Sequence, residues 1–259
     1  MNIAVLLKMV PDVVEELSIA ENGKTLDEAW LRLNISESDG YALEEAIILK
    51  EKYGGTVTVA ALDAEEVDYN LFLALAKGAD RAIRITGDWK NYGSPAIAKV
   101  FTKFLQDDGI IDKQTLILSG SQAIDDLEGE MVHYLADNLN LPGNSIVTGI
   151  NYNAEHNKIT YFKEFSGGIR GEFEVEIPAV LGVQAAENPP RYIPIAKVKA
   201  IQKTAHIEEV EIPPSDMPVM VEINRLFLPE ITGAAEILSG TEAEISSRIV
   251  DILSEKGII

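Results

Sequence analysis

Short apolar runs alternate with helix-like segments over the first 140 residues, and this alternation restricts the fold more than any other feature. Four runs have the length and composition of buried strands, at residues 3–7, 56–62, 81–85 and 115–118. Four segments have the apolar spacing of helices, at residues 36–52, 65–77, 94–105 and 127–140. Strands that alternate with helices pair in parallel through right-handed crossovers. The sequence therefore predicts an α/β fold with a mostly parallel sheet and helices on both faces.

The pattern changes in the second half of the chain. Three segments alternate like antiparallel strands, at residues 146–152, 158–165 and 171–177, and residues 179–183 form another buried run. We therefore expect a β-hairpin excursion that returns to the sheet. Prolines then interrupt the chain before an amphipathic helix at residues 241–255. These features predict a domain over residues 1–212 and an extended C-terminal arm over residues 213–259.

The arm carries the apolar residues Leu226, Phe227 and Leu228, which need a surface to cover. That surface could belong to the same domain or to a partner chain. An extended segment with weak local structure gains little by lying on its own sheet. We therefore expect the arm to pack on a partner.

Composition excludes several classes of function. Among the 259 residues there is no cysteine, which excludes disulfides and thiolate sites, and the formal net charge of -20 disfavours binding to nucleic acid. No apolar run reaches the length of a membrane span, so the chain is not expected to be membrane-embedded. Residues 1–8 resemble a strand without a cleavage site. The chain is therefore expected to stay where it is made, in the cytoplasm.

The sequence contains no motif of a self-contained enzyme. It lacks a Walker loop, a G-x-G-x-x-G turn and a G-x-S-x-G elbow, and its three histidines are far apart. Four carboxylates gather near the start of the predicted helix at residues 127–140, namely Asp125, Asp126, Glu128 and Glu130. Acidic residues at such a place complement the helix dipole, so we expect a helix cap and no metal site.

The stretch most suggestive of ligand binding is residues 115–142. A buried strand leads into the small-residue loop 119–126 and then into the start of a helix. In α/β proteins, nucleotides bind at the carboxyl ends of such strands and near helix N-termini. The sequence therefore predicts a nucleotide-type cleft at this edge of the sheet.

A second stretch, residues 187–203, combines apolar and basic residues in an otherwise acidic chain. Its Asn-Pro-Pro start predicts extended backbone, because proline disfavours helical backbone in the residue before it. Ile193, Ile195 and Val198 then accompany three lysines. The pattern fits a solvated helix on the core and equally a docking loop with an apolar anchor, and the sequence alone does not decide between them.

Six short motifs along the chain match, in register, the motifs of one known family. The family's V-K-x-V-P-D, N-P-x-D-x-Y-A-L-E-E-A, A-L-A-M-G-A-D-R-A, G-x-Q-A-I-D, P-A-V and N-E-P-R-Y correspond to residues 7–12, 36–46, 74–82, 120–125, 178–180 and 188–192. By these motifs the chain resembles the β subunit of electron transfer flavoprotein, of the long-armed bacterial type. The resemblance spans essentially the whole chain and implies an adenine nucleotide α-hydrolase-like fold.

The resemblance implies one half of a heterodimer that carries electrons and has no catalytic residues of its own. In this family an α subunit holds most of the FAD, and the β subunit supports the flavin domain and extends an arm around it. The donor is expected to be a dehydrogenase of the acyl-CoA type, and the acceptor a quinone oxidoreductase or another protein. The family's partner-recognition loop, with its apolar anchor at Ile195, corresponds to Arg191, Tyr192, Ile193, Ile195 and Val198.

The resemblance also concerns the nucleotide cleft, since many β subunits bind AMP and electron-bifurcating members bind a second FAD that exchanges electrons with NADH. The family's phosphate-binding Q-T-G aligns with residues 130–132, where a valine and nearby acids would hinder a phosphate. We therefore expect AMP to be weakly held or absent, and we keep a bifurcating subunit and a stand-alone nucleotide sensor as alternatives. The positions assigned to the cleft are Leu6, Ser36, Ser38, Asp39, Leu62, Gln122, Asp125, Asp126, Leu127, Glu128, Gly129, Glu130, Met131 and Val132.

Overall fold

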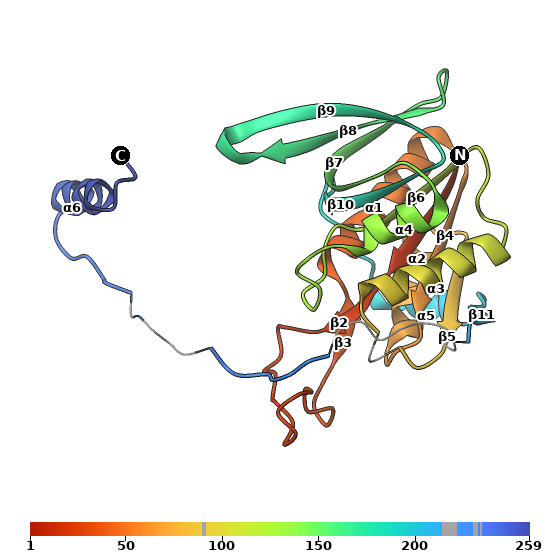
Figure 1. The fold of residues 1–259 in the computed structure, drawn as a ribbon, viewed down its shortest axis with the longest axis horizontal. Coiled ribbons are helices and arrows are strands. Elements are labelled where there is room, and N and C mark those ends of the chain that lie inside the picture. Colours follow the sequence, from red (N-terminus) through yellow and green to blue (C-terminus); the bar gives the residue numbers. More distant parts are fainter. Residues whose placement is uncertain (90–91, 214–221, 230–232, 234) are drawn as a thin grey trace. The chain divides into compact units, whose positions relative to one another are not determined.

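A computed structural model of the chain describes residues 1–89, 92–213, 222–229, 233 and 235–259 (Figure 1). The chain divides into two compact units, Met1–Asn224 and Arg225–Ile259. The first contains the sheet and its two cores, and the second contains the terminal helix. None of the described helices is long and apolar enough to cross a lipid bilayer.

Over the described residues, the first unit is built on a nine-stranded sheet in the order β11-β5-β4-β1-β6-β10-β7-β8-β9. β8 (Lys158–Phe165) and β9 (Ile169–Glu176) extend it in antiparallel pairing. The central strands are buried on both faces, which is why they read as continuous apolar runs. The predicted α/β class and the hairpin excursion are confirmed. The parallel part consists of β1 (Asn2–Leu7), β4 (Thr56–Leu62), β5 (Arg81–Thr86), β6 (Thr115–Gly120), β7 (Gly143–Asn153), β10 (Ala179–Ala185) and β11 (Glu208–Glu211).

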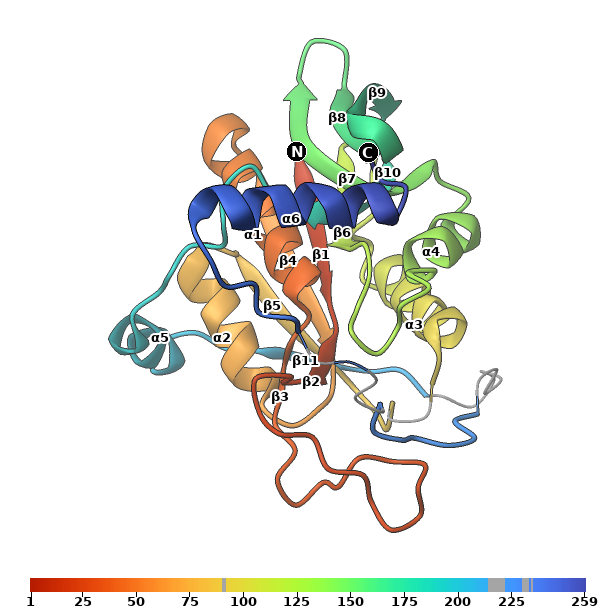
Figure 2. The ribbon, with the colours of Figure 1, turned by 90° about the vertical axis from the view of Figure 1, so that its left-hand side faces the viewer.

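Helices cover both faces of the sheet, as predicted (Figures 1 and 2). On one face, α1 (Glu37–Tyr53) and α2 (Val67–Lys77) bury side chains such as Leu43 in the first core. On the other face, α3 (Ser94–Asp107) and α4 (Met131–Leu139) bury Phe101 and its neighbours in the second core. Burying each large apolar side chain contributes about 1.5–3 kcal/mol, so both layers are firmly attached. A further helix, α5 (Ile195–Gln202), packs against α2 (Figure 2).

Some local features differ from the sequence prediction. Helix α4 begins at Met131, four residues later than expected, because residues 121–130 form a loop with a bridge between Ala123 and Asp126. The segment 8–33, expected to be irregular, contains β2 (Met9–Pro11), which pairs with β3 (Leu33–Ile35) in a separate two-stranded sheet. The edge strand β11 was not expected either, and a short 3-10 turn, Ser166–Gly168, joins β8 to β9.

The second unit contains α6 (Glu242–Glu255), which agrees with the helix predicted at residues 241–255. A capping box starts it: the Thr241 hydroxyl accepts the N–H of Glu244 at 3.4 Å, and the Glu244 carboxylate accepts the N–H of Thr241 at 2.8 Å. No residue of α6 itself is buried: Ile245, Ile252 and Leu253 are half-buried, and Ile249 and Val250 are exposed. Residues 214–221, next to the boundary predicted at 212–213, lie outside the described residues.

Candidate nucleotide cleft and docking segment

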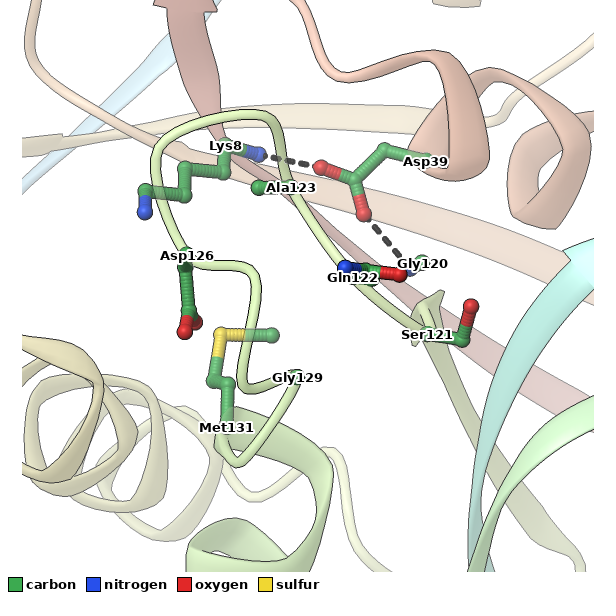
Figure 3. A pocket seen from close by; sticks show the side chains of 9 residues that line it. All are labelled: Lys8, Asp39, Gly120, Ser121, Gln122, Ala123, Asp126, Gly129 and Met131. Atoms are coloured by element: carbon green, nitrogen blue, oxygen red, sulfur yellow. Dashed lines mark hydrogen bonds between the residues drawn. The ribbon is translucent and has the colours of Figure 1, made fainter.

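The order of strands reverses at β1. From β1 the chain continues to β4 and β5 on one side, and then returns to β6 on the other side. The carboxyl ends of β1 and β6 therefore flank the switch point at which open α/β sheets bind ligands. Lys8 follows β1 directly and Gly120 ends β6, so both residues stand at this crevice (Figure 3).

Asp39, in the first turn of α1, joins the ends of these two strands. Its buried carboxylate accepts the backbone N–H of Lys8 at 2.8 Å and that of Gly120 at 2.5 Å (Figure 3). Burial raises the pKa of Asp39 to about 7, although the two N–H donors and the charge of Lys8 act in the opposite direction. A carboxylate of the protein thus occupies backbone donors at the switch point, where a ligand anion would otherwise find them.

The start of α1 is fastened to the loop that follows β6. The hydroxyls of Ser36 and Ser38 both donate to the carbonyl oxygen of Gln122, the former at 3.3 Å. Helix α1 and strand β6 approach each other so closely here that a Cβ atom added at Gly120 would collide with the Ser38 hydroxyl. Contacts within the chain therefore close the side of the cleft to which the sequence assigned Ser36, Ser38 and Asp39.

Two of the four carboxylates at residues 125–130, in the loop before α4, have partners within the protein. Asp125 forms an ion pair with Lys8 at 2.8 Å, and Asp126 accepts a hydrogen bond from the hydroxyl of Ser94. The predicted capping role is wrong, because the first turn of α4 contains no acid and the preceding Glu130 makes no side-chain cap. These carboxylates hold the loop in place, and Asp125 neutralises the cation nearest to the cleft.

The space left at the switch point is small. Gly129 has a φ of 62°, and a Cβ atom there would lie 2.6 Å from the carbonyl oxygen of Ser121, so the loop requires glycine. The side chain of Met131 lies beside Gly129 and Asp126 in the hollow (Figure 3). The space open to the centre of a water molecule is about 20 Å³ here and about 130 Å³ in an adjacent hollow between the loop and β7. Pockets for drug-sized ligands occupy roughly 300–1,000 Å³.

A second candidate site is the segment that precedes α5. The guanidinium of Arg191 contacts Glu44 of α1 at 2.8 Å and forms a bidentate pair with Glu51 at 2.6 and 3.0 Å. The next residue, Tyr192, is 83% exposed, and Ile195 at the start of α5 is 58% exposed. An ion-paired anchor is therefore followed directly by two exposed apolar side chains, which is the composition of a docking surface.

Comparison with known proteins decides the family. A family model described as the electron transfer flavoprotein domain matches residues 24–215 of the chain. The chain belongs to the electron transfer flavoprotein family. It is 32% identical over 270 residues to the electron transfer flavoprotein subunit beta of Bacillus subtilis, with 100% of each chain covered. It is 30% identical over 267 residues to that of Methylophilus methylotrophus, with 98% of each covered, and 31% identical to a mitochondrial subunit beta of Oryza sativa, with 93% and 95% covered. These relatives identify it as a β subunit.

The residues that the sequence assigned to partner recognition do not all face solvent. Tyr192 and Ile195 are exposed, whereas Ile193 is half-buried and Arg191 is held by ion pairs. The assignment of Val198 to partner recognition is wrong, because this side chain is fully buried. Helix α5 packs on the protein through Val198, as the interpretation of a helix on the core expects, and the docking role of the segment before it stays a prediction.

The structure brings together only some of the residues assigned to the cleft. Leu6, Leu62 and Val132 bury their side chains in the second core, so none of the three lines the first hollow. Val132 therefore does not block the approach of a phosphate. Those that line the first hollow are Asp39, Gln122, Asp126, Gly129 and Met131. Leu127 and Glu128 line the second hollow.

Sequence reasoning missed the contribution of Lys8, Gly120 and Ser121 to this cleft. The position of Lys8 immediately after the first strand was a usable signal, since strand ends carry binding residues in α/β folds. Among the described residues, no group of three His, Cys, Asp or Glu side chains is arranged to hold a metal ion.

Proposed function

We propose that this β subunit is the non-catalytic half of a heterodimeric electron carrier whose FAD is held mainly by an α subunit. The observation that carries the proposal is the full-length match to β subunits. The cleft supports it, because the side chain of Asp39 already occupies the backbone donors at the switch point. The hollows of about 20 and 130 Å³ at the switch point are smaller than the roughly 300–1,000 Å³ of ligand pockets, which supports a flavin held by another chain. The flavin supplies the redox chemistry when bound, and this chain supplies support and partner recognition.

The proposed electron donor is a dehydrogenase of the acyl-CoA type, and the proposed acceptor is a quinone oxidoreductase or another protein. The exposed Tyr192 and Ile195 support docking of such a protein. Aromatic and large aliphatic residues on a held backbone lose little entropy on binding, which favours them as anchors. The neighbouring Lys197 and Lys199 are also exposed, so the surface suits a partner with acidic groups around an apolar pocket.

The C-terminal arm is proposed to pack on the α subunit. Within its own unit, Phe227 is 67% exposed, Leu228 is 73% exposed and Leu226 is half-buried. Apolar residues that are left uncovered in this way mark a surface for another chain. The predicted domain at residues 1–212 with its arm at 213–259 remains part of this proposal, as does the expected cytoplasmic location.

The cleft is proposed to hold AMP weakly or not at all and to hold no second FAD, which argues against the bifurcating alternative. Asp39 already accepts the N–H groups of Lys8 and Gly120, and Asp125 already pairs with the ammonium group of Lys8. A nucleotide phosphate would have to displace these carboxylates or lie beside them. Like charges about 4 Å apart repel by roughly 4 kcal/mol near a protein surface.

An anaerobic reduction experiment tests the proposal. The purified heterodimer is mixed with a catalytic amount of an acyl-CoA dehydrogenase and its acyl-CoA, and the flavin absorbance is followed. The proposal predicts bleaching that requires the dehydrogenase, and no bleaching with NADH alone. Bleaching by NADH alone would support a bifurcating subunit, and no bleaching under either condition would refute the assignment of the donor.

A further inference from the structure

Two adjacent carboxylates of α1 hold the segment that presents Tyr192 and Ile195. Glu44 accepts the backbone N–H of Arg191 at 2.9 Å and its Nε at 2.8 Å. Glu45 accepts the backbone N–H of Glu187 at 3.0 Å. The segment is therefore attached to the helix on both sides of its two prolines, at the backbone as well as at the side chain.

Both carboxylates are buried, which is unusual for acids on a helix. Glu44 is 3% exposed and Glu45 is 2% exposed. Burying a carboxylate is costly unless its oxygens are bonded, so these residues are poor choices for a helix that only needs to pack. Their hydrogen-bond donors are the backbone N–H of Glu187 and the backbone N–H and side chain of Arg191. The attachment of residues 187–191 therefore accounts for the burial of these two carboxylates.

We infer that Glu44 and Glu45 are positioning residues that fix the exposed Tyr192 and Ile195 for docking of the electron donor. The inference rests on the proposed function, because it assigns the same surface to donor recognition. An anchored segment loses less conformational entropy when the donor binds than a free one does. Glu51 completes the anchor by its bidentate pair with Arg191, and it lies at the solvent edge of the helix.

Arg81 offers a matched control elsewhere in the protein. Its guanidinium is also held by two carboxylates, Glu208 at 2.7 and 3.0 Å and Asp108 at 2.9 and 3.2 Å. Its attachment joins β5 to β11 and to the end of α3, and not to the segment before α5. Arg81→Ala and Arg191→Ala therefore remove similar networks and differ in what the network holds.

The test uses the complete flavin-containing heterodimer and a purified acyl-CoA dehydrogenase as donor. Arg191→Ala and Glu45→Ala should each raise the donor concentration for half-maximal electron transfer about 10-fold, with an unchanged maximal rate, because ordering costs are added to binding. Glu45→Gln should behave like the native protein, since its amide oxygen still accepts the N–H of Glu187. Arg81→Ala should lower the melting temperature without changing the half-saturating donor concentration.

Hydrogen exchange separates failure of the anchor from failure of the proposed function. Arg191→Ala and Glu45→Ala should accelerate amide exchange in residues 187–195 of the heterodimer, and Arg81→Ala should not. Equal exchange in all variants would overturn the anchor even if the donor reduces the native heterodimer. Faster exchange with an unchanged half-saturating concentration would overturn the role in docking. If the native heterodimer accepts no electrons from the dehydrogenase, the proposed function fails, and so does this role.

Discussion

The buried carboxyl of Asp39 makes the stability of the protein depend on pH in a predictable direction. Burial raises its pKa from an ordinary 3.8 to about 7. The folded state therefore binds this proton more tightly than the unfolded state, so the contribution of Asp39 to stability is fully present below about pH 4 and is lost as the pH rises to about 7. At about 1.4 kcal/mol per pH unit, the loss assigned to Asp39 is roughly 4 kcal/mol.

Asp39→Asn should remove this dependence. Asparagine keeps one acceptor for the N–H of Lys8 or Gly120 and cannot ionise, so the free energy of unfolding should fall by about 4 kcal/mol less than in the native protein between about pH 4 and pH 8. Ionisation of Glu45 also lowers the free energy of unfolding as the pH rises over this range, because burial raises the pKa of Glu45 from 4.5 to about 7. The difference between the two curves isolates Asp39, since Glu45 is present in both proteins.

Urea unfolding at several pH values, followed by tryptophan fluorescence, measures this effect. Trp89 is 6% exposed and reports on the core around β5, whereas Trp30 is exposed in both the folded and the unfolded state. Glu155→Gln serves as the control, because this carboxylate is exposed in the turn between β7 and β8. Parallel curves for Asp39→Asn and the native protein would refute the reasoning, since Asp39 would then titrate alike in both states.

Three further results are expected. Gly129→Ala should destabilise the protein by more than Gly109→Ala. Both residues have a positive φ, which costs alanine about 1–2 kcal/mol, but only at Gly129 would the added Cβ collide with a carbonyl oxygen. Equal losses of stability in thermal unfolding would contradict the tight loop. Removing residues 225–259 should weaken binding of the α subunit at least ~100-fold in calorimetric titration, since burying each large apolar side chain contributes about 1.5–3 kcal/mol. Thermal unfolding of residues 1–224 should stay unchanged. An unchanged affinity for the α subunit would show that the arm packs on its own domain. Acid-quenched heterodimer should release far less than one AMP per complex on chromatography, and one AMP or a second FAD per complex would show that the loop at Gly129 opens.

The sequence predicts the layers of the fold well, because strands buried on both faces and helices with one apolar stripe leave distinct patterns. It does not predict the start of α4, since residues 127–130 have helical spacing but are held in a loop by the contacts of Asp125 with Lys8 and of Asp126 with Ser94. Such contacts join residues that are far apart in the chain. No local pattern encodes them, and tertiary structure overrides propensity at this point.

The candidate sites show the same limit. Asp39 could be assigned to the cleft from its motif, but its role as the carboxylate that joins β1 to β6 requires the strand order. Val132 was assigned to the cleft because an aligned motif gives position and not depth, and the helix turns its side chain into the core. Likewise, Val198 and Ile195 lie three residues apart in the same helix, yet one is buried and the other exposed. Helical periodicity puts residues three apart on the same side of a helix, so it does not predict this difference, which depends on the position of α5 on the protein.

As a β subunit, this chain is expected to depend on a partner for its flavin. Co-expression with an α subunit, followed by size-exclusion chromatography with mass and flavin determination, tests it most directly. We expect a yellow one-to-one heterodimer with a single FAD, and a chain that is colourless when purified alone. A lone chain that is stable and carries a full equivalent of FAD would show that the flavin needs no α subunit.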